Sequence, residues 1–239
     1  MPIRGALEHM IAVTYGVTYD AVVTRFRPYE VLIEDVVGLV ARSAPPTANP
    51  RSVRVLDIAC GIGNVGLRLA RAGYSVVGVD AVRHLVAIAR EKHHASGGPN
   101  LTFHHLDLAR DPLPGAGTFD VLVSMHTLYW HPDPEGLLAA CRRALKPGGC
   151  AIFLTYGRPA RIVQTFQEVR ATEGFGAALR ALRWLAPTVI FELFRDCEHR
   201  YLSETEFHEA LDRAGFDILE ARRAFLAGLS HLAWVRARE

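Results

Sequence analysis

A glycine-rich junction between a predicted strand and a predicted helix decides the fold, and it reads Val55-Leu56-Asp57-Ile58-Ala59-Cys60-Gly61-Ile62-Gly63-Asn64-Val65-Gly66. The run before the loop is apolar and rich in β-branched residues, which is typical of a buried strand. The glycines at positions 61, 63 and 66 permit a tight turn and a close approach of a ligand to the backbone. The N-terminus of the following helix offers unpaired N–H groups. Taken alone, this loop suits a dinucleotide as well as any other nucleotide.

Short apolar runs alternate with helical patterns on both sides of the loop. Helical patterns at 65–72, 85–94 and 135–145 separate the runs, and Pro147-Gly148-Gly149 stops the last helix. This alternation is typical of βαβ units. It predicts an α/β fold with a doubly wound, mostly parallel sheet and helices on both faces. The expected strands cover residues 53–58, 75–80, 100–106, 119–124 and 150–156.

The regions outside this alternation predict additions to a single domain. After the fifth strand, helix-like patterns at 162–169 and 177–185 predict an inserted helical lid. A later helix has Ser203 as its expected N-cap and ends at Gly215. The expected layout of residues 1–239 is an N-terminal helical cover and linker (1–52), a cofactor-binding core (53–156), a lid insertion (157–200), and a closing helix (204–214) with strands (216–221 and 232–235) in residues 201–239.

Composition and charge argue against several classes of protein. The formal net charge is +2, and the basic residues are scattered arginines with only two lysines, Lys92 and Lys146. Without a basic block, nucleic acid is not an expected partner. The four cysteines form no CxxC pair, which predicts reduced thiols and a cytoplasmic location. The sequence begins without the apolar run of a signal peptide and predicts no membrane span.

Two aspartates distinguish between the nucleotides that the loop could hold. Asp57 lies at the end of the first strand, where its carboxylate would repel a pyrophosphate and attract a cation. S-adenosylmethionine carries an ammonium and a sulfonium, so Asp57 favours this cofactor over NAD. Asp80 ends the second strand, where it can accept both hydroxyls of a ribose, and this supports either cofactor. The alternative for Asp80 is a cap on the helix that follows.

The motifs together resemble those of class I S-adenosylmethionine-dependent methyltransferases, in the same order and spacing. The resemblance covers residues 53–156 and is greatest to the small-molecule group that includes ubiquinone and menaquinone biosynthesis methyltransferases and natural-product methyltransferases. It implies a Rossmann-like fold with S-adenosylmethionine as cofactor. The matching segments are Asp57-x-Ala59-Cys60-Gly61-x-Gly63-Asn64, Gly78-Val79-Asp80, Asp107-Leu108 and Leu145-Lys146-Pro147-Gly148-Gly149.

The resemblance also implies roles for individual residues. Gly61 and Gly63 would contact the methionine part of the cofactor, and Asp80 would hold the ribose. Asp107, with the Leu108 backbone, would bind the amino edge of the adenine. The expected cofactor-binding residues are Tyr19, Asp57, Ala59, Gly61, Gly63, Asp80, Ala81, Asp107, Leu108 and Ser124.

Two of these assignments have alternatives. Asp107 could instead cap a turn before Asp111-Pro112. Tyr15 and Tyr19 are candidates because an aromatic N-terminal helix often closes over the cofactor in this family. Their alternative is simple helix packing.

The residues after the fourth strand are expected to face the acceptor, because open α/β sheets bind ligands at the carboxyl ends of their strands. His126 lies there and is the predicted catalytic residue, as a general base or as an orienting hydrogen-bond partner. An imidazole whose pKa is about 6.5 can accept a proton at neutral pH. The alternative is that His126 bonds a backbone carbonyl and closes the cofactor pocket; His131 is a weaker candidate for the base.

These observations predict S-adenosylmethionine-dependent methyl transfer to a small-molecule acceptor, through an oxygen, nitrogen or carbon nucleophile, by in-line displacement at the sulfonium. We expect no metal site, because the sequence contains no HxxxH or HExxH pattern. Two alternatives stay open: an NAD-dependent oxidoreductase, and a non-methylating relative such as a cyclase. An apolar or aromatic acceptor is favoured, unless the aromatic side chains of the lid only form its own core; they are Phe166, Phe175, Trp184, Phe191 and Phe194.

Overall fold

The computed structural model describes residues 26–45, 48–96, 98, 100–158, 161–194 and 201–238, without the side chains of residues 96 and 187–194. Two of the candidate residues, Tyr15 and Tyr19, lie outside the described residues. Among the helices of the described part, none is long and apolar enough to cross a membrane.

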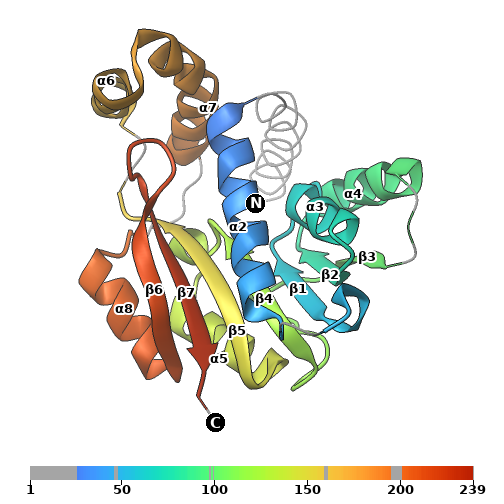
Figure 1. Cartoon of the computed structure of the whole chain (residues 1–239). Coiled ribbons are helices and arrows are strands. Elements are labelled where there is room, and N and C mark those ends of the chain that lie inside the picture. The colour runs from blue at the N-terminus through green and yellow to red at the C-terminus, as the bar shows by residue number, and fades with distance from the viewer. Residues whose placement is uncertain are drawn as a thin grey trace, which may run out of the picture.

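Seven strands form one sheet in the order β3-β2-β1-β4-β5-β7-β6 (Figure 1). The first five strands along the chain run parallel, and β7 is antiparallel to both β5 and β6. The strand order reverses between β1 and β4, and ligands bind at such switch points in open α/β sheets. The strands are β1 (Arg54–Ile58), β2 (Ser75–Asp80), β3 (Leu101–His105), β4 (Phe119–Met125), β5 (Leu145–Tyr156), β6 (Phe216–Ala224) and β7 (Ser230–Ala237).

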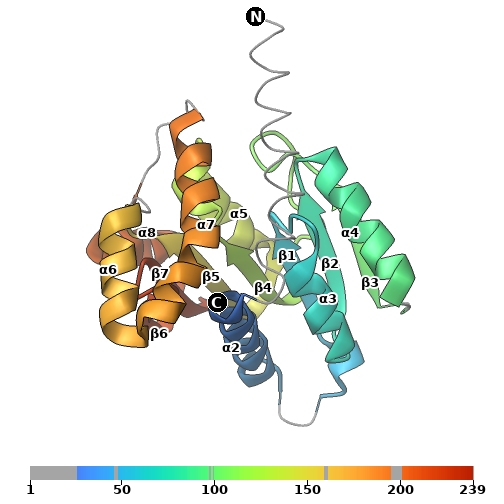
Figure 2. The ribbon, with the colours of Figure 1, turned by 90° about the horizontal axis from the view of Figure 1, so that it is seen from above.

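Helices cover both faces of the sheet (Figures 1 and 2). The apolar sides of these helices pack on the sheet and form two separate cores. Alternate residues of a strand point to opposite faces, so Val121 and Val123 join one core and Leu122 joins the other. One face carries α2 (Arg27–Ser43), α3 (Asn64–Arg71) and α4 (Arg83–Ser96), and the other carries α5 (Pro134–Ala144) and α8 (Glu204–Arg213).

The predicted doubly wound α/β class is confirmed, with differences at several boundaries. β2 has the predicted bounds, and Ser203 caps α8 through a complete capping box with Glu206. The prediction that the fifth strand starts at residue 150 was wrong. β5 begins at Leu145, which already pairs with Phe119 of β4. The next pair is Cys150 with Val121, so the Pro147-Gly148-Gly149 segment belongs to β5 and lies where the register between the two strands shifts. β6 and β7 are also longer than predicted.

The insertion after β5 is helical, as predicted. It contains α6 (Ile162–Glu173) and α7 (Phe175–Phe194), which meet at Gly174, where φ is +90°. A positive φ favours glycine, so the chain can turn sharply there. The apolar run at 189–194 continues α7. Figure 2 shows the α6–α7 pair on the β5–β7 side of the molecule, and Figure 1 shows it at the end where the parallel strands finish.

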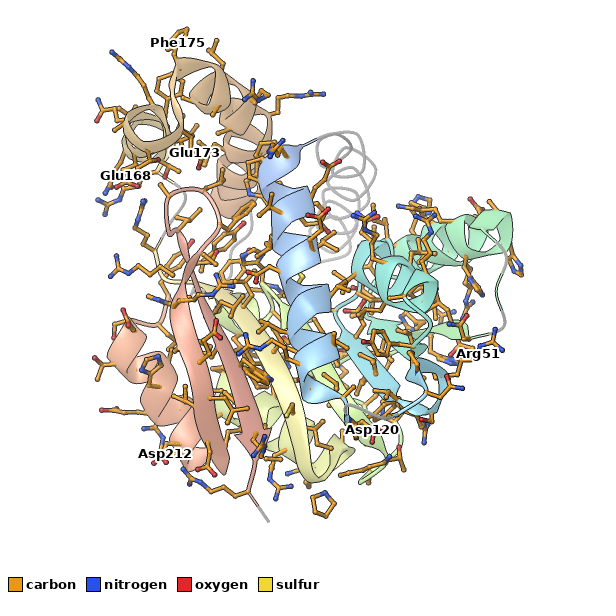
Figure 3. All side chains as sticks on the ribbon, in the orientation of Figure 1. Arg51, Asp120, Glu168, Glu173, Phe175 and Asp212 are labelled. Atoms are coloured by element: carbon orange, nitrogen blue, oxygen red, sulfur yellow. The ribbon has the colours of Figure 1, made fainter. Side chains whose placement is uncertain are left out.

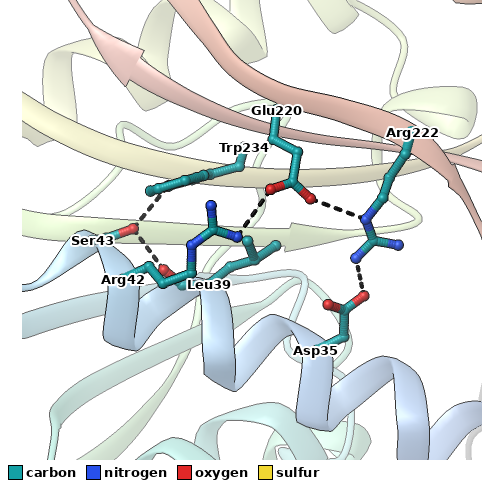
Figure 4. Close-up of polar contacts among 7 residues, drawn as sticks. All are labelled: Asp35, Leu39, Arg42, Ser43, Glu220, Arg222 and Trp234. Carbon is teal, nitrogen blue, oxygen red and sulfur yellow. Dashed lines mark hydrogen bonds and ion pairs between the residues drawn. The ribbon is translucent and has the colours of Figure 1, made fainter.

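Polar contacts fasten α2 to the C-terminal hairpin (Figure 4). The Trp234 indole N–H donates to Ser43 Oγ at 2.9 Å. The Arg42 guanidinium lies 4.3 Å from the Trp234 ring centroid and donates to Glu220 at 2.9 Å. The connection therefore joins segments almost two hundred positions apart, and it comprises Asp35, Arg222, Glu220, Arg42, Ser43 and Trp234.

Trp234→Phe should remove the hydrogen bond to Ser43 and keep an aromatic ring beneath Arg42. We expect a loss of about 1 kcal/mol in the free energy of unfolding, measured by urea denaturation. Ser43→Ala is the matched variant. The free energy of unfolding of the double variant should be little lower than that of either single variant. Fully additive losses would show that the two side chains do not interact.

Candidate active site

A cavity of about 260 Å³ opens at the carboxyl ends of the parallel strands. Its walls come from the ends of β1, β2, β4 and β5 and the segments after β1 to β4, together with side chains from α2 and α7. The parallel topology brings these segments to one edge of the sheet. Seven of the predicted site residues line this cavity: Asp57, Ala59, Gly61, Asp80, Ala81, Leu108 and His126.

The glycine loop presents backbone to the cavity. Ala59 and Gly61 both have a φ of +53°, and a Cβ added to Gly61 would meet no atom within 4 Å. Gly63 serves a different purpose, because its added Cβ would lie 2.5 Å from the Phe103 ring. Gly63 therefore allows α3 to start against Phe103 and does not itself line the cavity.

Two buried carboxylates lie beside this loop. Asp57 is 2% exposed and accepts from the Gly66 N–H at 3.1 Å. Asp80 accepts from the N–H groups of Gly61 and Val82, each at 2.8 Å. Val82 precedes the first residue of α4, so its bond to Asp80 closes the turn before the helix and is not itself the helix cap that was the alternative for Asp80. Each carboxylate oxygen still has a lone pair free for a ligand.

Burial makes both carboxylates reluctant to ionise. It raises the pKa of Asp57 to about 7, with a smaller contribution from the charge of Asp80. Burial also raises the pKa of Asp80, against the opposing effect of its two backbone hydrogen bonds. No lysine or arginine lines the described part of the cavity wall. A cationic ligand would supply the missing charge and favour the ionised forms.

The other end of the cavity is aromatic. The Tyr156 ring stacks on the His126 ring at 4.1 Å between centroids, and the Trp184 N–H donates to the Tyr156 hydroxyl at 3.2 Å. Tyr129 packs edge-on against Tyr156 at 5.0 Å. Trp130 and Tyr29 complete this aromatic wall, and Met125 adds an apolar side chain to the same lining.

His126 is held at several points. Its backbone has a φ of +54°, an uncommon conformation for a residue other than glycine. Its N–H donates to the Leu154 carbonyl at 2.6 Å, and its own carbonyl accepts from the Trp130 indole at 2.8 Å. The imidazole Nε2 lies 2.9 Å from Ser230 Oγ. The ring nitrogen Nε2 thus bonds a hydroxyl of the C-terminal hairpin, and not the backbone carbonyl that the alternative named.

The expectation that His126 titrates near neutral pH was also wrong. Burial lowers its pKa to about 3. The imidazole is therefore neutral throughout the physiological range and is a weak proton acceptor. Ser230 was not predicted as part of the site, because it lies in a distant strand whose pairing with β5 sequence patterns do not specify.

Other predicted residues lie away from this cavity. Asp107 accepts from the Ala109 N–H at 3.0 Å and lies 3.6 Å from Arg110, which is the turn-capping geometry of the alternative. Ser124 is 1% exposed, and its hydroxyl has no hydrogen-bond partner among the described residues. Around the described chain, no three His, Cys, Asp or Glu side chains form a metal-binding group.

A family model described as a methyltransferase domain matches residues 25–221, which is most of the chain. The chain belongs to the S-adenosylmethionine-dependent methyltransferase family. This assignment agrees with the carboxylate-lined cavity and removes the support for an NAD-dependent oxidoreductase.

Curated methyltransferases are similar to this chain in sequence. The ubiquinone biosynthesis O-methyltransferase of Roseobacter denitrificans is 30% identical over 185 residues, covering 77% of this chain and 67% of the relative. That of Aromatoleum aromaticum is 36% identical over 105 residues, which cover 44% of each protein. The match therefore spans less than half the length of some of these relatives.

Solved methyltransferase structures have the same fold. The S-adenosylmethionine-dependent methyltransferase of Mesorhizobium loti has a TM-score of 0.58 at 24% identity, covering 82% of this chain and 95% of that one. The magnesium protoporphyrin IX methyltransferase of Synechocystis, with bound S-adenosylhomocysteine, has a TM-score of 0.62 at 19% identity, covering 88% and 84%. The cyclase SpnF has a TM-score of 0.60 at 19% identity, covering 85% and 80%. These likenesses show the fold alone.

The methyltransferase site fits its family's cofactor on chemical grounds. The open backbone at Gly61 leaves space for a ligand against the loop. The two buried acids would face the positive charges of S-adenosylmethionine. The aromatic wall starts at the end of β4, beside this acidic part.

The ionisation of Asp57 gives a test in the cofactor-free methyltransferase. Because its pKa of about 7 lies above the ordinary 3.8, the stability that Asp57 contributes is fully present below pH 4 and is lost as the pH rises through 7. Asp57→Asn can still accept from Gly66. It should raise the free energy of unfolding at pH 8 by up to about 4 kcal/mol and change it little at pH 4.

Asp217→Asn, at an exposed residue paired with Arg238, is the control for this measurement. It should not produce the same pH dependence. A carbon-13 NMR signal of the Asp57 carboxyl that titrated near pH 4 would contradict the raised pKa.

Proposed function

We propose that the protein transfers the methyl group of S-adenosylmethionine to a small-molecule acceptor that is apolar or aromatic, through an oxygen, nitrogen or carbon nucleophile. The observation that carries this proposal is one cavity at the strand ends that is lined both by two buried carboxylates, from β1 and β2, and by aromatic side chains from α2, α7, the end of β5 and the segment after β4. When bound, S-adenosylmethionine supplies a methyl group already activated on a sulfonium. The protein's task is to align the acceptor and to exclude water.

The carboxylates bind the cofactor in this proposal. Asp57 faces the ammonium group, and its ionised form becomes favourable once a cation lies beside it. Asp80 accepts the ribose hydroxyls with the lone pairs that Gly61 and Val82 leave free. The backbone of Ala59 and Gly61 contacts the methionine part, while Ala81 and Leu108 contact the nucleoside.

Three predicted cofactor contacts have weaker support. Asp107 would have to bind adenine while also capping its own turn. Gly63 would act indirectly, by allowing the start of α3. Ser124 is buried and does not belong to the cavity lining.

The aromatic wall binds the acceptor. Tyr129, Tyr156 and Trp184 are each less than 7% exposed and offer flat apolar surfaces. Trp184 comes from α7, so the α6–α7 pair acts as a lid that helps to exclude water. Because the described lining lacks arginine and lysine, an uncharged acceptor is favoured over an anionic one.

His126 orients the acceptor. A neutral imidazole can donate or accept one hydrogen bond, and its stacking on Tyr156 fixes the plane of the ring. Its lowered pKa argues against the alternative role as a general base. A single domain remains our prediction from the length and hydrophobic content of the chain, and a cytoplasmic location without nucleic acid as partner remains our prediction from the cysteine and charge patterns.

Asp80→Ala should weaken the binding of S-adenosylhomocysteine by roughly 1.5 to 3 kcal/mol, because it removes a charged acceptor of two hydrogen bonds. Isothermal titration calorimetry measures this loss. Asp212→Asn, at an exposed surface ion pair, is the control and should bind normally. An unchanged affinity of the Asp80 variant, or measurable binding of NAD by the unmodified protein, would refute the proposed site.

His126→Gln distinguishes an orienting role of the imidazole from a role as general base, once an acceptor that the enzyme methylates is in hand. As an orienting group, His126 should contribute roughly tenfold to turnover, and the affinity for S-adenosylhomocysteine should stay within about threefold. Because its pKa is about 3, the turnover of the unmodified enzyme should show no His126 ionisation between about pH 5.5 and 8. A break in kcat near pH 6.5 that disappears in the variant would instead establish a general base.

A further inference from the structure

A second cavity, of about 400 Å³, lies outside the candidate active site. It is formed by the first turns of α2, the region where α6 meets α7, and the turn between β6 and β7. Figure 3 shows Glu173 on the side of the α6–α7 pair that faces this turn. The charged residues of the lining are four arginines, Arg27, Arg180, Arg222 and Arg223, and two acids, Asp35 and Glu173.

Two of the four arginines are already engaged. Arg222 is bonded to Asp35 and lies 3.1 Å from Glu220. Arg223 lies 3.8 Å from Glu204. Arg27 and Arg180, by contrast, have no carboxylate within 4.0 Å anywhere in the described ranges. The lining therefore carries an excess of positive charge that the described side chains do not neutralise.

The turn at the edge of this cavity is strained and offers backbone donors. Phe225, Leu226 and Ala227 have φ values of 60°, 38° and 56°, in the left-handed region that residues other than glycine rarely adopt. The N–H groups of Gly228 and Leu229 both donate to the Phe225 carbonyl, at 2.9 and 2.8 Å. Those of Leu226 and Ala227 have no acceptor in the part of the chain that the structure describes. Strained backbone of this kind is often found at ligand-binding sites.

We propose that this cavity binds a small organic anion, a carboxylate or phosphate monoester with an apolar body. Arg27 and Arg180 bind the anionic head, since guanidinium groups match the geometry of both anions. The N–H groups of Leu226 and Ala227 supply further donors. Val31, which is 51% exposed, and Phe225 contact the apolar body. The proposal does not depend on methyl transfer.

The second cavity is separated from the candidate active site by the Phe225 side chain. Its ring meets Trp184 edge-on at 5.0 Å and lies 5.8 Å from His126. Trp184 lines the candidate active site, whereas Phe225 lines the second cavity. A ligand in the second cavity therefore lies one ring away from Trp184, and its binding should shift the NMR signal of the Trp184 indole N–H.

The test uses the full chain, with benzoate and phenyl phosphate as anionic probes and benzamide as the neutral match. Both anions should bind saturably and about tenfold or more tightly than benzamide. The double variant Arg27→Gln and Arg180→Gln should weaken anion binding by about tenfold or more. Arg183→Gln is the control, because Arg183 is exposed on the same helix one turn along and does not line the cavity.

Four results would overturn the proposal. Three are equal binding of benzamide and benzoate, an equal loss of binding from Arg183→Gln, and the absence of saturable binding by either anion. The fourth is displacement of benzoate by saturating S-adenosylhomocysteine, because the probe would then occupy the candidate active site. The double variant should still bind S-adenosylhomocysteine normally, so failure here and failure of the proposed methyl transfer are distinguishable.

Discussion

The burial of Asp57 and Asp80 at one edge of the sheet is the constraint on which the site depends. Two carboxylates placed close together in an apolar environment destabilise the folded chain when both are ionised. Backbone N–H groups of the loop and of two helix starts offset part of this cost. Side chains of the described cavity wall supply no positive charge. A cationic ligand beside the two carboxylates would offset this cost, and S-adenosylmethionine carries an ammonium and a sulfonium.

The rest of the fold places the acceptor side against these acids. Parallel strands bring the loops after β1, β2 and β4 together, whereas the aromatic wall needs elements from both ends of the chain. α2 supplies Tyr29, α7 supplies Trp184, and the β6–β7 hairpin supplies the hydroxyl that holds His126. The contacts of Figure 4 fix α2 to that same hairpin. The stability of the hairpin is thus linked to the geometry of the proposed acceptor site.

Sequence patterns predicted the parts of the structure that depend on local physics. The bounds of β2 follow from its apolar run and from Asp80 at its end, and the helical insertion follows from its periodicity. Other features depend on tertiary neighbours. The lowered pKa of His126 results from burial, Ser230 reaches it through antiparallel pairing, and Gly63 is required by the Phe103 ring. None of these neighbours is visible from the spacing of residues along the chain.

The central claim is that the acidic end of the cavity binds the positive charge of the cofactor. Calorimetry with S-adenosylhomocysteine and with its analogue lacking the amino group tests this claim most directly, since the two ligands differ by one ammonium. At pH 8 the analogue should bind at least about tenfold more weakly, and Asp57→Asn should remove most of that difference. Equal affinities of the two ligands for the unmodified protein would contradict the claim.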